Sequence, residues 1–171
     1  MEIQDKIVNK VALSGLITFD LASIAPQGER VLLDIKDQLF HGLILREKDF
    51  REYVKELDWS QYEGKHVAIT CSADAIIPTW AYMLLSNRLE PFAESITFGD
   101  LEVLENILFE RALEGLDMSR FEGQRVMVKG CGDIKIPESA FITLTRKLSK
   151  VAKSIMYGEA CSSVPIYKRK G

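Results

Sequence analysis

The chain has 171 residues, of which 47% are hydrophobic and 27% are charged, and its formal net charge at pH 7 is −3. This length is enough for one ordinary globular domain with a substantial core. The small negative charge excludes a general attraction to nucleic acid or to anionic membranes. No apolar run approaches the roughly 20 residues that a membrane-spanning helix needs, so we expect no membrane association.

The first ten residues, MEIQDKIVNK, mix acids with lysines and contain no apolar core of a signal peptide. We therefore expect an unexported, cytoplasmic protein. The chain has three cysteines, an odd number, and in a reducing compartment cysteines serve as thiols or ligands rather than as a disulfide framework.

The first 43 residues predict a short helix followed by two strands. A helix that ends near Gly15 is indicated by apolar residues at helical spacing, namely Ile3, Ile7, Val8 and Val11. Residues 16–21 and 31–35 have the composition of strands, and the turn residues Pro26, Gln27 and Gly28 lie between them. We expect these strands to form a hairpin that adds antiparallel edge strands to the sheet.

The rest of the chain contains an internal repeat. Residues 58–100 align without a gap to residues 117–159 at an offset of 59, and 15 of the 43 aligned positions are identical. Unrelated segments of ordinary composition would share about three. Weaker similarity extends upstream through a preceding helix, so we assign residues 44–100 to repeat one, 103–159 to repeat two and 160–171 to a tail, whose basic end from Tyr167 onward we expect to be solvated.

Each repeat predicts helix, strand, helix and strand. In repeat one the strands are residues 66–71 and 95–98, and Pro78 opens the helix between them. Repeat two has strands at 125–129 and 154–157 and a helix opened by Pro137. Strands that alternate with helices are typical of parallel sheets with right-handed crossovers. We therefore predict a single α/β domain, 1–171, with an open, mainly parallel sheet built from an internal helix–strand–helix–strand duplication.

The three cysteines are the best chemical clue. Cys71, Cys131 and Cys161 lie at or just beyond the carboxyl ends of predicted strands, and in an open parallel sheet these ends share one edge where ligands bind. Three thiolates at one edge would hold a zinc ion or part of an iron–sulfur cluster. Further ligands would come from the following residues: Asp74, Asp133, Glu159 and His41.

Two other hypotheses remain open. In the first, the protein is a thiol-dependent enzyme with Cys71 or Cys131 as the nucleophile and Asp74 or Asp133 as its acid–base partner. The two aspartates have a structural alternative, since each precedes a helix whose N-terminus a carboxylate would cap. His66 lies at the opposite end of its strand from Cys71, which is a poor geometry for a Cys–His pair. In the second hypothesis the cysteines only pack, and the chain is a protein-interaction module.

Other ligands are disfavoured. The segment Gly130–Asp133 follows a strand and is glycine-rich, but it has neither of the common phosphate-binding patterns, so we expect no nucleotide cofactor. The tryptophans and tyrosines suit core and rim positions and form no platform for stacking bases. A protein partner is conceivable, and no feature predicts an oligomeric state.

Three stretches resemble a family known only as a bacterial domain of unknown function, DUF2480. They are DIKDQLFHGLILREKDFR (34–51), DWSQYEGKHVAITCSADAIIPTWAYMLLS (58–86) and KSIMYGEACSSVP (153–165). The resemblance covers the whole chain, and it is most specific around Cys71 and Cys161. It implies a small cytoplasmic bacterial protein and a link to iron–sulfur cluster assembly. It implies no catalytic residues.

Overall fold

The computed structural model describes residues 15–130, 132, 134–159 and 162–170. Residues 27–108 form one compact unit, here called the inserted unit, and residues 1–26 together with 109–171 form another, the terminal unit. Helix α4 (Leu101–Glu114) belongs to the inserted unit up to Leu108 and to the terminal unit from Phe109 onward. The predicted N-terminal helix lies outside the described residues.

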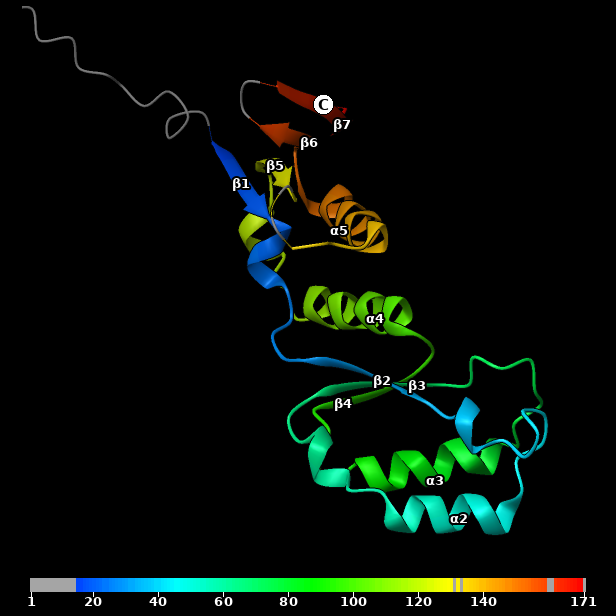
Figure 1. The fold of residues 1–171 in the computed structure, drawn as a ribbon. Coiled ribbons are helices and arrows are strands. Elements are labelled where there is room, and N and C mark those ends of the chain that lie inside the picture. Colours follow the sequence, from blue (N-terminus) through cyan, green and yellow to red (C-terminus); the bar gives the residue numbers. More distant parts are fainter. Residues whose placement is uncertain (1–14, 131, 133, 160–161, 171) are drawn as a thin grey trace, which may run out of the picture. The chain divides into compact units, whose positions relative to one another are not determined.

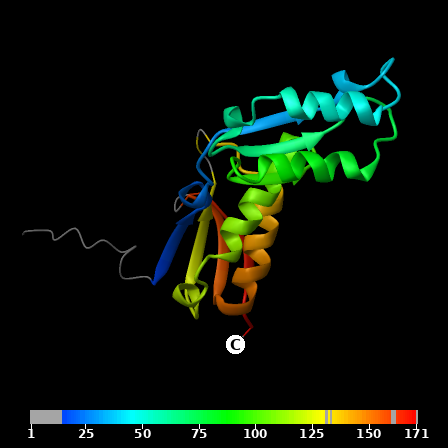
Figure 2. The same cartoon turned by 90° about the horizontal axis from the view of Figure 1, so that it is seen from below.

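The inserted unit is built on a three-stranded parallel sheet in the order β2 (Arg30–Asp34), β3 (His66–Thr70) and β4 (Ser95–Phe98). The connections run over helices α2 (Glu47–Glu56) and α3 (Thr79–Leu89), which lie side by side on one face of the sheet (Figures 1 and 2). Short 3₁₀ helices at Lys36–Gln38 and Trp59–Tyr62 complete the connections.

Alternation along β3 gives this sheet two different faces. Val67 and Ile69 pack into the core beneath α2 and α3, where Phe50 is fully buried. Ala68 points to the opposite face and packs against Leu104 and Leu108 of α4. Because alanine has so small a side chain, the helix can approach the backbone of β3 closely.

The terminal unit contains a four-stranded mixed sheet in the order β1 (Leu16–Asp20), β5 (Arg125–Lys129), β6 (Ser154–Glu159) and β7 (Ser162–Lys168). The first three strands are parallel, and β7 pairs with β6 in the antiparallel direction. Helix α5 (Glu138–Val151) connects β5 to β6, and 3₁₀ helices at Leu21–Ile24 and Ser119–Phe121 follow β1 and precede β5.

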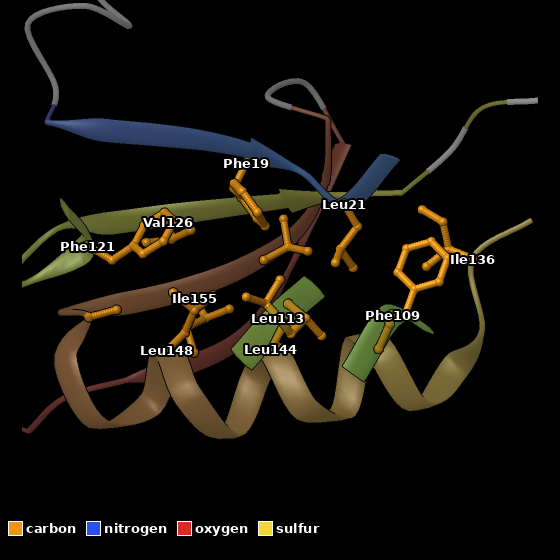
Figure 3. Close-up of a cluster of buried hydrophobic side chains, with 13 residues drawn as sticks. Phe19, Leu21, Phe109, Leu113, Phe121, Val126, Ile136, Leu144, Leu148 and Ile155 are labelled. Atoms are coloured by element: carbon orange, nitrogen blue, oxygen red, sulfur yellow. The ribbon is translucent and has the colours of Figure 1, made fainter. Parts of the chain in front are cut away.

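The core of the terminal unit lies between this sheet and its helices, as Figure 3 shows. Val126 and Ile155 point from β5 and β6 toward Leu144 and Leu148 of α5. Phe19 and Phe121 meet edge to face with ring centroids 5.4 Å apart. Phe109 and Leu113, from the second half of α4, complete the same cluster.

The predicted α/β class and the open, largely parallel arrangement are confirmed, but the prediction of one sheet is wrong because the described strands form two. The predicted N-terminal hairpin is also wrong. β1 pairs in parallel with β5, and β2 pairs in parallel with β3. The physical reason is burial: Phe19 and Leu21 belong to one core, whereas Leu33 and Ile35 belong to the other.

Within the segment 160–171, which the sequence assigned to a tail, the structure places Ser162–Lys168 in β7, a strand whose residues are mostly exposed. The basic residues at the C-terminal end of this segment favoured a tail in the sequence analysis, although the segment pairs with β6. None of the helices in the described part combines the length and the apolar character that a membrane crossing requires.

Candidate functional site

The carboxyl edge of the inserted sheet centres on Asp34, the last residue of β2. Its carboxylate accepts hydrogen bonds from the backbone N–H groups of Lys36 and Ser72, both at 3.0 Å, and from Ser72 Oγ at 2.5 Å. Burial by itself would raise the pKa of Asp34, but these hydrogen bonds outweigh it and hold the pKa below its ordinary value. Asp34 therefore fixes the loop that follows β3.

Cys71 follows β3 at this edge, as predicted. Its thiol is half-buried against the core of the inserted unit, and Sγ lies 3.9 Å from the carbonyl oxygen of Ala73. Burial raises the pKa of the neighbouring Tyr82 phenol, and the charges of Cys71 and Asp34 raise it further. Cys71 and Asp34 therefore lie close enough to Tyr82 to affect its phenol. The described contacts of Cys71 are packing contacts.

The other predicted ligands that the structure describes lie on different elements. Asp74 is exposed in the inserted unit, and His41 lies exposed in a turn with a φ of 52°. Glu159 belongs to the terminal unit and forms an ion pair with Lys129. Cys131, Asp133 and Cys161 lie outside the described residues. Within the described ranges, no three His, Cys, Asp or Glu side chains are grouped closely enough to hold a metal ion.

The helix-capping alternative for Asp74 is wrong. Helix α3 begins after Pro78 and has no side-chain cap at its first turn. Pro78, the N-cap residue, is extended, with φ −60° and ψ 134°. Helix α5 begins in the same way after Pro137.

His66 has a structural role. It is buried at the start of β3, with Nδ1 2.8 Å from Ser95 Oγ and Nε2 2.7 Å from the carbonyl oxygen of Gln27. Both ring nitrogens are therefore engaged, and the histidine ties β3 to β4 and to the segment before β2. As predicted, it lies at the opposite end of the strand from Cys71.

A groove of about 640 Å³ runs beside β4, between this strand and α3. Tyr82 and Phe98 meet edge to face at one part of it, with ring centroids 5.0 Å apart. Two large apolar side chains on its wall are strongly exposed, since Met83 shows 68% and Phe98 67% of its surface to solvent. Exposed apolar residues gathered at a hollow typically mark a binding surface.

The terminal unit has a corresponding groove of about 420 Å³ between β6 and α5. The two grooves share five lining positions that are 59 residues apart: Ile69 and Val128, Tyr82 and Phe141, Ser86 and Thr145, Ile96 and Ile155, Phe98 and Tyr157. The aromatic contact recurs between Phe141 and Tyr157 at 5.8 Å. Here, however, Ile166 of β7 forms part of the wall.

Sequence reasoning assigned Tyr82 only to a core or rim position and missed the groove. A signal was present, because the repeat aligns Tyr82 with Phe141 and Phe98 with Tyr157. Two aromatic residues conserved in kind at both copies indicate a recurring contact. What the sequence could not show is that one copy of this contact is exposed.

Comparison with known proteins confirms the resemblance. The family model described as "Protein of unknown function (DUF2480)" matches residues 5–169, so the chain belongs to this family. No curated protein and no solved structure matches the chain. The family description carries no activity.

Proposed function

We propose that the protein is a protein-binding module whose inserted unit holds a partner in the groove beside β4. One observation carries this proposal: the groove beside β6 is walled by β7, whereas in the described part of the chain the related groove beside β4 has no such strand. Equivalent residues differ accordingly, because Ile155 is 1% exposed while Ile96 is only partly buried.

The exposed side chains are large enough to support binding. Complete burial of a methionine or phenylalanine side chain stabilises by about 1.5–3 kcal/mol relative to exposure. Met83 of α3 and Phe98 of β4 both line the groove, and each already has about a third of its surface buried, so a partner that covers both gains about 2–4 kcal/mol before the entropic cost of association.

The packing of Cys71 supports a protein-binding module rather than a thiol-dependent enzyme, since its described contacts are those of a core residue.

The internal duplication expected from the sequence is part of the proposal: an ancestral unit with a covered groove would have given one copy that keeps the covering strand and one that lost it. A cytoplasmic location belongs to the proposal as well.

Photochemical cross-linking tests the binding role. Benzoylphenylalanine is placed at position 83 of the full chain, or as a control at position 142, which is 59 residues on and where Ile142 is 62% exposed. Irradiation in cells that make the protein should give a defined adduct with another protein from position 83 and none from position 142. The purified partner should then bind Met83→Glu about tenfold or more weakly and Ile142→Glu with unchanged affinity.

Three results would contradict the proposal. They are the absence of an adduct at position 83, equal adducts at both positions, and an adduct that contains only two copies of this chain. The last result would show that the groove serves self-association.

A thiolate metal site is a second candidate, favoured by one observation. The ion pair from Lys129 Nζ to Glu159 Oε2 holds the ends of β5 and β6 together, and Cys131 and Cys161 each follow two residues later. Zinc or an iron–sulfur cluster would then be held by these two thiolates, with Cys71 and a carboxylate of Asp74, Asp133 or Glu159 as further ligands. Such a site would fit a role in cluster assembly.

Metal content tests this second candidate. Untagged protein purified without oxygen and without chelator should contain near-stoichiometric zinc, or iron with sulfide and a visible absorption band. Cys131→Ser and Cys161→Ser should both lose it. Cys71→Ser separates the three-cysteine site from a two-cysteine site, because only the former loses metal with this change. Metal-free protein after anaerobic reconstitution would exclude the site.

A further inference from the structure

Strand β7 shows what covers the edge of the terminal sheet. It runs antiparallel to β6, with Tyr157 opposite Val164 and Ile155 opposite Tyr167. Ile166 forms part of the groove wall, together with Phe141 and Tyr157. An extended segment thus covers both the backbone of the edge strand and the apolar hollow beside it.

The backbone of β4 is arranged to accept a similar segment. Gly99 N–H donates to the carbonyl oxygen of Ile69 at 2.9 Å, so this N–H points toward β3. Because successive N–H groups along a strand point to opposite sides, those of Phe98 and Ile96 point away from β3. Of the described strands, only β3 pairs with β4. The outer edge of β4 therefore offers hydrogen-bonding groups to an added strand.

The charges beside β4 define which segment fits. Glu90 is the only charged residue among those described as lining the groove, and Glu94 is exposed just before the strand begins. The corresponding residues of the terminal unit are Ser149 and Lys153.

In the terminal unit, the chain at the C-terminal end of β7 lies beside Lys153 at the start of β6. Arg169 N–H donates to the carbonyl oxygen of Lys153 at 2.9 Å, and its Nη2 donates to that of Lys150 at 2.8 Å. A segment laid along β4 in the same direction would bring its C-terminal end beside Glu90 and Glu94. Lysine or arginine there would be complementary in charge.

From these observations we propose that β4 accepts an extended segment of another protein as an antiparallel fourth strand. The segment places an aliphatic side chain in the groove and carries Lys or Arg at its C-terminal end. This inference rests on the proposed protein-binding function and adds the conformation, direction and charge of the partner.

A second copy of this chain fits the edge less well. Two β4 strands paired about a two-fold axis would bring their acidic ends, Glu94 and Asp100, near one another. The outer edge of β7 is interrupted by Pro165, which has no N–H to donate. These two pairings are disfavoured, so the partner that we propose is a segment of a different protein.

A peptide with the sequence of residues 162–170 is a suitable probe, because it already covers the equivalent edge and ends in three basic residues. The full chain is titrated with this peptide, and amide hydrogen exchange is followed by nuclear magnetic resonance. We expect saturable binding that slows exchange of the Ile96 and Phe98 amides by at least about tenfold. The amide of Thr97, which by the alternation from Gly99 points toward β3, should not change.

Matched variants separate the parts of the inference. Phe98→Pro removes the outward N–H together with the ring, whereas Phe98→Val removes only the ring, so the proline variant should bind the peptide about tenfold more weakly than the valine variant. Glu90→Lys with Glu94→Lys should weaken binding about tenfold, and a peptide with its three basic residues changed to Glu should restore it. Thermal unfolding confirms that each variant is folded.

The outcomes distinguish this inference from the function on which it rests. Protection that appears on β6 instead of β4, or equal binding by Phe98→Pro and Phe98→Val, would overturn strand addition. If the cross-link at position 83 were still present, the protein-binding function would stand with a partner of another shape. Loss of that cross-link would remove both.

Discussion

The inserted and terminal units differ most at one edge. Each has parallel strands joined through helices, and each has an aromatic contact beside its last parallel strand. In the terminal unit β7 covers that strand, and Tyr157 is half-buried, whereas the corresponding Phe98 is 67% exposed. Related local sequences therefore end in different surfaces, and the difference lies in the chain that follows.

Two glycines at corresponding positions allow the two exits. Gly99 has a φ of +139°, and a Cβ there would lie 2.8 Å from Val103, because the chain turns at once into α4. Gly158 has a φ of +118°, and a Cβ would lie 2.5 Å from the carbonyl oxygen of Ser162. Only glycine fits either turn. The first turn leads into a helix and the second leads into the covering strand.

The strongest test of the comparison removes one phenylalanine from each core. Phe50 and Phe109 are 59 residues apart and both fully buried, so Phe50→Ala and Phe109→Ala should each lower the free energy of unfolding by about 3–5 kcal/mol. Both tryptophans, Trp59 and Trp80, belong to the inserted unit. Urea unfolding followed by tryptophan fluorescence should shift more for Phe50→Ala than for Phe109→Ala. Equal shifts would show that the two cores unfold as one.

Removing β7 should make the terminal unit resemble the inserted one. A chain that ends at Glu159 loses the strand and the contacts of Tyr167 and Arg169. We expect a loss of about 2–4 kcal/mol in the free energy of unfolding and stronger fluorescence of an apolar dye at the opened groove. The exposed substitution Ser163→Ala is the control. Unchanged stability of the shortened chain would contradict the covering role of β7.

Cys71 and Gly130 occupy aligned positions with different packing. A Cβ at Gly130 would lie 2.3 Å from the ring of Phe141, so Gly130→Ala should destabilise by about 1–3 kcal/mol. Cys71→Ala removes one half-buried sulfur and should cost about 1 kcal/mol or less. Thermal unfolding of both variants measures the difference. A larger loss for Cys71→Ala would indicate a role of the thiol beyond packing.

The smallest expected effect is a pH dependence shared by both units. Hydrogen bonds from the Ser60 side chain and backbone lower the pKa of Asp58, and those from Ser119 lower the pKa of Asp117. A lowered pKa in the folded state stabilises the protein above the unfolded-state value of about 4. This contribution is lost as the pH falls through the lower folded-state value. Carboxyl titration by nuclear magnetic resonance should find both values depressed, and Asp58→Asn should weaken the acid dependence of the unfolding temperature.

Much of the fold could be predicted from local pattern. Short β-branched runs bounded by glycine indicated β3, β4 and β5 within a residue of their ends, and Pro78 and Pro137 marked where two helices begin. These features are local, because hydrophobic period and turn residues act over a few positions. Pairing is not local, and the hairpin predicted for β1 and β2 was wrong for that reason.

The candidate site was predictable only in part. Cys71 does lie at the carboxyl edge of a sheet, because it directly follows β3 in the sequence and the end of a strand can be predicted from local pattern. The sequence could not show that the strand ends divide between two sheets, nor that β3 is the one described strand that pairs with β4. Asp34, which holds the loop after Cys71, lies 38 residues before Ser72, and only the folded chain brings them together.

The sequence by itself determined the α/β class, the order of helices and strands from β1 to β6 and the placement of one cysteine at a strand end, because hydrophobic period, glycine and proline act on neighbouring residues. Tertiary structure alone decided that β1 and β2 belong to different sheets, that β7 covers β6, and that Met83 and Phe98 stay exposed beside β4. The physical reason is that strand pairing and burial depend on which distant segments the folded chain brings to a given sheet edge, and this is a property of the whole chain.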